Sequence, residues 1–417
     1  MKKICIVILF LLFNISVIKS QEIQNQNGLS IEQAIERALQ YNPEIKKGIE
    51  NINGIKGKKL SEISLEQPEI SLSYEFIPTG RGLGNYEERT FEVSQSFDFP
   101  YDYFLKSSKY DIETSILSHE LRSIKQKVIS NVRSSYYKIL ANEEKLKIIN
   151  ENISITKEFY RTSEIRFNVG EGTYIEVLTA KVQLSEAEKN VEIVKNELEN
   201  SHRELNYAMG IPDHNYNISF NLINKLEYIQ SDVTLDALIK KVSSINPEIK
   251  KSELQVNSKS IQKTLAWTSL LPKFNLGYLR QSSQFNSNFY GVSFGFTMPL
   301  WFFLDQNGRI KESNAEFNFA KEELRSTKND VYLKLYNLYN DLKNKEKVVK
   351  FYQNEILPQS EEVMMTALKS YTAGEISYVE FLQASQTLIT SKINYIETLT
   401  DYILTMISIE EITGFKK

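Results

Sequence analysis

The residue types that most often carry chemistry are few in this chain of 417 residues, and they form no catalytic pattern. The three histidines are scattered, at His119, His202 and His214. There is no His-Glu-x-x-His pair, nucleophile elbow or phosphate-binding loop. The only cysteine is Cys5, and the adjacent Met364 and Met365 would point about 100° apart on a helix, too far to share one ion. We therefore predict that the protein is not an enzyme and binds no cofactor or metal.

Carboxylates beside two glycines are the remaining candidates for a functional site. The same three positions occur twice, 204 residues apart, as Gly170, Glu171 and Glu176 and then as Gly374, Glu375 and Glu380. Glycine permits positive φ, so each set indicates a tight turn. The glutamates are either ordinary solvated side chains or part of a charged contact surface.

The offset of 204 residues holds along nearly the whole chain. Asn42-Pro43-Glu44 returns as Asn246-Pro247-Glu248, Tyr74 meets Tyr278 and Gly210 meets Gly414. Such self-similarity at one period indicates a repeat architecture. We predict repeat 1 over residues 21–210, a linker over 211–232 and repeat 2 over 233–417.

Residues 1–20 are expected to be a cleaved signal peptide, because a basic start is followed by an apolar stretch that is too short to span a membrane. Cleavage would remove three lysines and no acidic residue, so the formal charge would change from −3 to −6. An acidic chain of this kind does not indicate a nucleic-acid surface.

Four long segments are nearly free of glycine and proline and predict long helices, at residues 101–169, 173–209, 309–373 and 375–413. In the first of them apolar residues recur at steps of three and four, which is typical of coiled coils. A helix over residues 101–169 would be about 100 Å long at ~1.5 Å per residue. Each repeat is therefore predicted to consist of a helix, a hairpin, a long helix and a further helix.

Two short segments alternate apolar and polar residues with period two and predict one β-hairpin in each repeat, within residues 69–100 and 273–299. Their strands approach the 9–11 residues that cross a membrane in a barrel, with one apolar face and one small, polar face. Surface ribbons packed on the helices are the alternative. Because open sheet edges do not occur in lipid, four strands from one chain would have to share a barrel with other copies.

These features together resemble the TolC-type outer-membrane efflux channel family over about residues 29–414. The resemblance rests on the Leu29-Ser30-Ile31-Glu32-Gln33-Ala34 opening and its echo at Val233-Thr234-Leu235, and on the turn motifs at 166–178 and 370–382. It implies a mainly α-helical fold with a transmembrane β part. Three chains would form a 12-stranded barrel in the outer membrane of a Gram-negative envelope, above an α-helical tunnel that extends into the periplasm.

The resemblance also implies partners and site residues. A periplasmic adaptor protein would contact the turns at Gly170, Glu171, Gly374 and Glu375, and an inner-membrane pump, with the RND type favoured, would supply energy. Tyr371, Glu380 and Glu176 would line the periplasmic entrance, where three copies of Glu380 would favour cations. For Tyr371 the alternative is an aromatic side chain that packs between helices. The family pattern repeats the acid three residues after Glu380, whereas this chain has Gln383.

The function expected from the resemblance is an outer-membrane exit duct of a tripartite efflux system for small toxic compounds or metal cations. A type I protein secretion duct of the same fold is a second possibility. A periplasmic coiled-coil structural protein or adhesin is a possibility from a different class.

Overall fold

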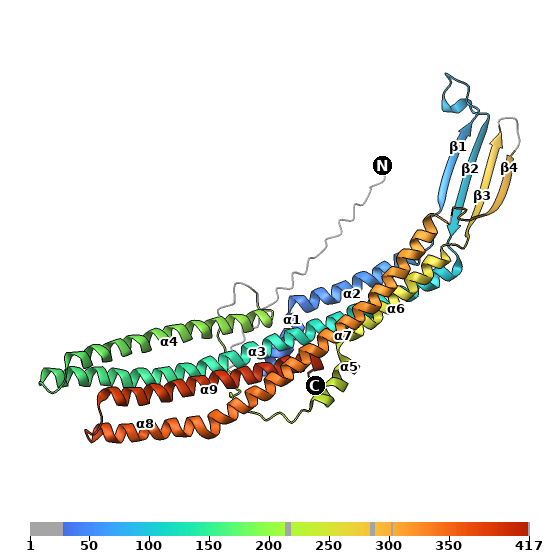
Figure 1. Ribbon diagram of the computed structural model, residues 1–417. Coiled ribbons are helices and arrows are strands. Elements are labelled where there is room, and N and C mark those ends of the chain that lie inside the picture. The colour runs from blue at the N-terminus through green and yellow to red at the C-terminus, as the bar shows by residue number, and fades with distance from the viewer. Residues whose placement is uncertain (1–27, 213–217, 284–287, 302, 416–417) are drawn as a thin grey trace, which may run out of the picture.

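The computed structural model describes residues 28–212, 218–283, 288–301 and 303–415. The described chain is long and curved, with a small four-stranded sheet at one end and long helices that run from it to the far end (Figure 1). The mainly α-helical fold with two hairpins and a two-fold repeat is therefore confirmed. The predicted signal peptide at 1–20 lies outside the described residues.

The two repeats contain the same elements in the same order. The first comprises α1 (Ile31–Tyr41), α2 (Pro43–Glu62), β1 (Glu69–Glu75), β2 (Glu88–Phe97), α3 (Pro100–Asn168) and α4 (Tyr174–Ala208), with a 3-10 turn η1 (Leu83–Asn85). The second comprises α5 (Leu235–Ile245), α6 (Pro247–Thr268), β3 (Lys273–Ser283), β4 (Asn288–Thr297), α7 (Asp305–Phe351), η3 (Tyr352–Ile356), α8 (Leu357–Thr372) and α9 (Tyr378–Thr413). Two helices, rather than the single predicted one, precede each hairpin.

The repeated asparagine explains why those helices divide. The side chain of Asn42 accepts a hydrogen bond from the Glu44 amide, at 2.9 Å, and thereby caps α2, while Pro43 takes the first helical position, where no amide hydrogen is needed. The same side chain donates to the Ala208 carbonyl at the end of α4, at 2.9 Å. Asn246 repeats the arrangement and donates to the Ile412 carbonyl at 3.0 Å. Each asparagine thus joins the beginning of its repeat to the last helix.

The second repeat departs from the first at Pro358. The sequence predicts one long helix over 309–373, but the structure inserts the π-helix η3 between α7 and α8. Proline has no amide hydrogen and its ring crowds the preceding turn, and a wider turn accommodates it: the Leu357 amide donates to the Tyr352 carbonyl, five residues earlier. The matching helix α3 has no proline after Pro100 and stays α-helical to Asn168.

The sheet is antiparallel in the order β1-β2-β3-β4, so the central pair β2–β3 joins the two repeats. Residues in register share a face, which gives the sheet an apolar face and a polar face. The apolar face contains Ile70, Leu72, Tyr74, Phe91, Val93, Phe274, Leu276, Tyr278, Val292, Phe294 and Phe296. The polar face contains Glu69, Ser71, Ser73, Glu75, Glu88, Thr90, Glu92, Ser94, Gly277, Ser293 and Gly295.

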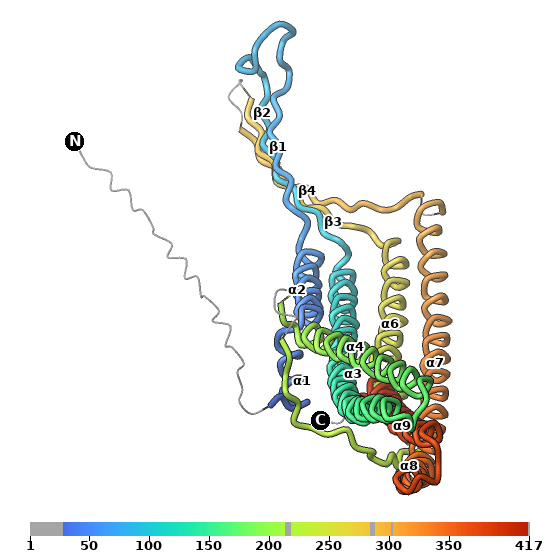
Figure 2. The backbone as a smooth tube through the Cα atoms, turned by 90° about the vertical axis from the view of Figure 1, so that its left-hand side faces the viewer, coloured from blue at the N-terminus to red at the C-terminus, as the bar shows by residue number. Residues whose placement is uncertain are grey.

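Each strand continues into a helix, and the helices keep the order of the strands. Below the sheet α2, α3, α6 and α7 lie side by side in one layer (Figure 2). Towards the far end α4 packs on α3, α3 on α9 and α9 on α8. The sheet and the four helices below it therefore form a curved wall one element thick, with β1 and α2 on one side and β4 and α7 on the other.

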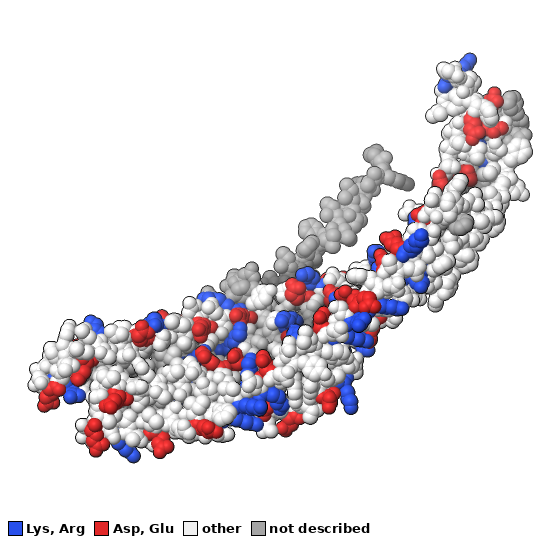
Figure 3. Space-filling model, in the orientation of Figure 1, with Lys and Arg blue, Asp and Glu red and all other residues white. Residues whose placement is uncertain are grey.

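The core lies midway along the wall, where the short helices and the linker cover α3 and α9. Tyr136 and Tyr402 are fully buried there. The Tyr136 hydroxyl donates to the side-chain oxygen of Asn224, and the Tyr402 hydroxyl donates to the Ile229 carbonyl, both at 2.8 Å. The sequence between the repeats is thus fixed against both halves. Charges of both signs cover the visible face of the helical part, whereas the sheet end is mostly uncharged (Figure 3).

A buried carboxylate adds to this core. The side chain of Glu346 in α7 is 8% exposed and accepts hydrogen bonds from Lys343 at 2.9 Å, Lys350 at 3.0 Å and the Tyr228 hydroxyl at 3.1 Å. Burial alone would raise the pKa of Glu346, but the hydrogen bonds from the two lysines and the tyrosine lower it below its ordinary value. This carboxylate ties the linker to α7.

Candidate functional site

The turns at Gly170 and Gly374 lie together at the end of the molecule farthest from the sheet (Figure 1). Both have the hydrogen bonds of a Schellman motif. Gly170 donates to the Phe167 carbonyl and Glu171 to the Arg166 carbonyl, at 3.0 and 2.9 Å; Gly374 and Glu375 repeat this with Tyr371 and Ser370, at 3.0 and 2.8 Å.

These turns require glycine because of their backbone conformation, not because a larger side chain would clash. The φ angles are +80° at Gly170 and +74° at Gly374, in the left-handed region that glycine adopts without cost. A Cβ atom added at either position would meet nothing within 4 Å. The tips are therefore open surfaces held in a fixed shape, which suits a contact with another molecule.

The glutamates that follow the turns serve the next helices as well. Ser377 caps α9, and the Glu380 carboxylate accepts from the Ser377 amide at 2.7 Å and from its hydroxyl at 2.8 Å. These hydrogen bonds lower the pKa of Glu380, which is exposed and stays charged. Thr173 caps α4 by accepting from the Glu176 amide at 3.3 Å. The Ser-x-x-Glu spacing of a capping box was present in the sequence at 377–380 and was not recognised there.

Glu380 lies in a groove between α8 and α9, whereas the Glu375 carboxylate accepts from Ser370 within its own turn, at 3.2 Å. The groove is also lined by Glu362, Thr366, Ser370, Gln383 and Thr387. Val363, Ala367, Ile376 and Ala384 line it as well, so the groove combines two carboxylates with polar and apolar side chains.

Tyr371 lies in an aromatic cluster that joins the two helix pairs near the tips. Its ring meets Phe159 of α3 edge-on, with centroids 5.7 Å apart, and Phe159 also packs on Tyr378 and Phe381 of α9, at 5.0 and 4.5 Å. Burial raises the pKa of Tyr378 to about 12, helped by Tyr371 and Glu176 nearby. The sequence motif placed Tyr371 near the turn, but only the fold shows its partner on α3.

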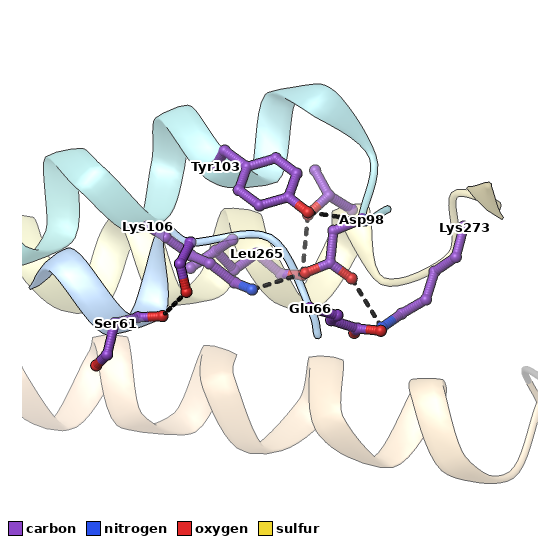
Figure 4. Close-up of polar contacts among 9 residues, drawn as sticks. Ser61, Glu66, Asp98, Tyr103, Lys106, Leu265 and Lys273 are labelled. Atoms are coloured by element: carbon purple, nitrogen blue, oxygen red, sulfur yellow. Dashed lines mark hydrogen bonds and ion pairs between the residues drawn. The ribbon is translucent and has the colours of Figure 1, made fainter. Parts of the chain in front are cut away.

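A second polar cluster, absent from the sequence predictions, marks the junction between the sheet and the helices. Asp98, directly after β2, forms ion pairs with Lys106 of α3 and Lys273 of β3, both at 2.7 Å (Figure 4). Lys273 also reaches Glu66, at 3.4 Å, and the Tyr103 hydroxyl accepts from the Asp98 amide at 3.1 Å. The cluster connects both hairpins to α3. The residues come from segments up to 207 residues apart in the chain, so no local pattern could reveal it.

Two kinds of feature are absent from the part of the chain that the structure describes. Within it, no group of three or more His, Cys, Asp or Glu side chains is placed to hold a metal ion. No helix among the described residues combines the length and apolar character that a membrane crossing needs.

Comparison with known proteins gives a consistent result. A family model described as outer membrane efflux protein matches residues 105–211 and 238–414. Outer membrane protein TolC of Salmonella enteritidis is 23% identical over 308 residues, which are 69% of this chain and 61% of that protein. Pyoverdine export outer membrane protein OpmQ of Pseudomonas aeruginosa is 21% identical over 294 residues, which are 68% of this chain and 58% of OpmQ. The chain thus spans less than two thirds of the length of these curated relatives.

Solved structures show the same fold. The crystal structure of the Campylobacter jejuni CmeC outer membrane channel has a TM-score of 0.78 at 16% identity and covers 92% of this chain and 85% of CmeC. The two matched ranges contain most of α3 and all of α4 and α6 to α9, which include the helices of the tips. The chain belongs to the outer membrane efflux protein family.

Proposed function

We propose that the chain is one protomer of a trimeric exit duct in the outer membrane, with its helices in the periplasm. The duct is passive and carries out no catalysis. It takes small toxic compounds or metal cations from an inner-membrane pump, with the RND type favoured, through a periplasmic adaptor that contacts the tips at Gly170, Glu171, Gly374 and Glu375.

The single observation that carries this proposal is that both edges of the wall that the structure describes are unpaired, in the sheet and in the helices below it. Within the described residues, β1 and β4 each pair on one side only, and unpaired strand edges do not occur in lipid. The outer helices α2 and α7 lie below these strands in the same order. Joining the β4 side of one copy to the β1 side of the next would pair the strands and pack the helices together, and three copies give twelve strands, within the range of known barrels.

The apolar and polar faces fit this arrangement. The apolar face would meet lipid and the polar face would line a wet lumen. Tyr371, Glu380 and Glu176 would then stand at the periplasmic entrance, where three carboxylates of Glu380 would attract cations.

Disulfide cross-linking tests the joint between copies. Strands β1 and β4 of one chain are three strand spacings apart, about 14 Å, whereas a disulfide requires Cα atoms within ~7 Å. Cysteines placed in pairs along polar-face positions, such as Ser71→Cys with Ser293→Cys, can therefore bond only between copies. Dimers and trimers on non-reducing gels are expected at some register, and each single variant is the control. Monomers at every register would contradict the shared barrel.

A further inference from the structure

The apolar face of the sheet carries two charged residues, and both are arginines. Arg89 in β2 is in register with Tyr74, and Arg280 in β3 is in register with Phe91 and Tyr290, so both side chains are on the apolar face. The acidic residues of the strands are on the polar face. Both arginines are exposed, and neither forms an ion pair within the described ranges.

The two arginines are close neighbours. Arg89 pairs with Ser282, which is two residues from Arg280, so they are diagonal neighbours on adjacent strands, ~7–8 Å apart at the backbone. Tyr74 is the cross-strand partner of Arg89, and Tyr290 is the cross-strand partner of Arg280. These four residues, named here the arginine band, cross the sheet. The arginines lie on its two central strands, away from the edges that a neighbouring copy would cover.

The level of the arginine band matches the outer boundary of a membrane. Seven residue steps lead from Lys273, at the helical end of β3, to Arg280, about 24 Å along the strand at ~3.4 Å per residue. Barrel strands tilt by about 35–45°, so this length spans about 17–20 Å of the apolar band, which is ~25 Å tall with aromatic residues at its boundaries. Long arginine side chains extend towards the interface and cover the remaining ~5–8 Å. Between these levels the β3 residues on this face are apolar, Phe274, Leu276 and Tyr278. A sheet inserted with its helices in the periplasm would hold the arginine band among the lipid headgroups of the outward leaflet.

The chemistry of the arginine band indicates what it binds. A guanidinium is charged at all relevant pH values and presents paired donors that match a phosphate group. Two such groups without acidic partners, beside tyrosines whose hydroxyls suit a boundary between lipid and water, form an acceptor for an anionic headgroup. We propose that Arg89 and Arg280, flanked by Tyr74 and Tyr290, bind the phosphate groups of anionic lipids in the outward leaflet, with three such sites in the trimer. This inference rests on the proposed barrel.

The test compares lipid binding by the intact protein and two double variants. Wild type, Arg89→Gln/Arg280→Gln and Arg81→Gln/Arg325→Gln are reconstituted into vesicles of phosphatidylcholine with one fifth phosphatidylglycerol. The lipids that stay bound to each trimer are then counted by native mass spectrometry. The control pair removes the same charge from a loop and from a helix. We expect the ratio of phosphatidylglycerol to phosphatidylcholine bound to wild type and control to be about tenfold above the ratio in the vesicles, and the Arg89/Arg280 variant to lose that preference.

The outcomes separate this inference from the proposed function. Trimers of all three proteins with equal phosphatidylglycerol preference would overturn the lipid site and leave the barrel intact. A wild type that forms no membrane-inserted trimer would overturn the proposed function and the inference with it. Should the glutamine variant fail to assemble, Arg89→Lys/Arg280→Lys keeps the charge and loses the paired donors, and full retention of the preference in that variant would also overturn the site.

Discussion

Replacing Phe294 by aspartate tests which face of the sheet meets lipid. Phe294 is 68% exposed in the single chain, is in register with Leu276 and stacks on Phe274 with ring centroids 6.2 Å apart. In a barrel this side chain would be covered by lipid, and its burial would be worth ~1.5–3 kcal/mol. A charge near the midplane adds a cost of up to ~2–4 kcal/mol for basic residues and less for acidic ones. We expect a loss of about 3–5 kcal/mol per protomer.

The matched control is an aspartate on the polar face, and two neighbouring positions in β4 differ in how well they would accept it. Ser293 is on the polar face, but a Cβ atom built at Gly277 would lie 2.4 Å from the Ser293 hydroxyl and 3.7 Å from the Glu92 carboxylate. An aspartate at position 293 would therefore meet both crowding and charge repulsion. Gly295 is on the same face, and a Cβ atom added there meets nothing within 4 Å. Gly295→Asp would project a carboxylate into water and should change stability by about 1 kcal/mol or less.

The assay is urea titration of the protein folded into phospholipid vesicles, together with the fraction of each variant that reaches the outer membrane in cells. Phe294→Asp should lower the urea midpoint strongly and accumulate outside the membrane, while Gly295→Asp should behave like wild type. If Gly295→Asp were impaired as much as Phe294→Asp, or more, the assignment of the two faces would be wrong or shifted by one residue.

Three further predictions concern the helical part. Glu380→Gln should lower cation preference in planar bilayers more than Glu375→Gln, because of these two glutamates Glu380 alone lines the groove, and glutamine still satisfies the capping box. Equal reversal potentials for the two variants would refute the acidic entrance. Gly374→Ala should destabilise the protein by ~1–2 kcal/mol, because φ is +74° at this position. Gly54→Ala in α2 should instead stabilise it by ~0.5–1 kcal/mol. Thermal denaturation would measure both changes, and equal effects would exclude the backbone explanation. Glu346→Gln should lower the free energy of unfolding by ~1–2 kcal/mol at pH 7. Because the pKa of Glu346 in the folded protein is lowered from 4.5, the difference between variant and wild type should fade as the pH falls below that value. A constant difference down to pH 3 would contradict this.

Local patterns predicted most of the architecture. The alternation in both hairpins and the turn glycines act through neighbours in sequence, so the hairpins and the tips were predicted. The capping asparagines carry a local signal too, but the division of the helix before each hairpin was not predicted from it. Pro358 was visible too, but a proline can end, kink or widen a helix, and the packing of the surrounding helices decides among these. The Asp98–Lys273 ion pair and the Phe159–Tyr371 contact join residues distant in sequence, and a single sequence does not encode such pairs in any short pattern.

The asparagines that cap α2 and α6 have a consequence for the order in which the chain assembles. Each donates to a carbonyl 166 residues later, within its own half. The first half can therefore close once α4 has arrived, before any of the second half is present, whereas the second closure requires almost the whole chain. A chain that stops after residue 212 still contains both partners of the first hydrogen bond, and a chain cut before Ile412 lacks one partner of the second. The duplication has therefore given each half its own closing hydrogen bond, and the two closures need different lengths of chain.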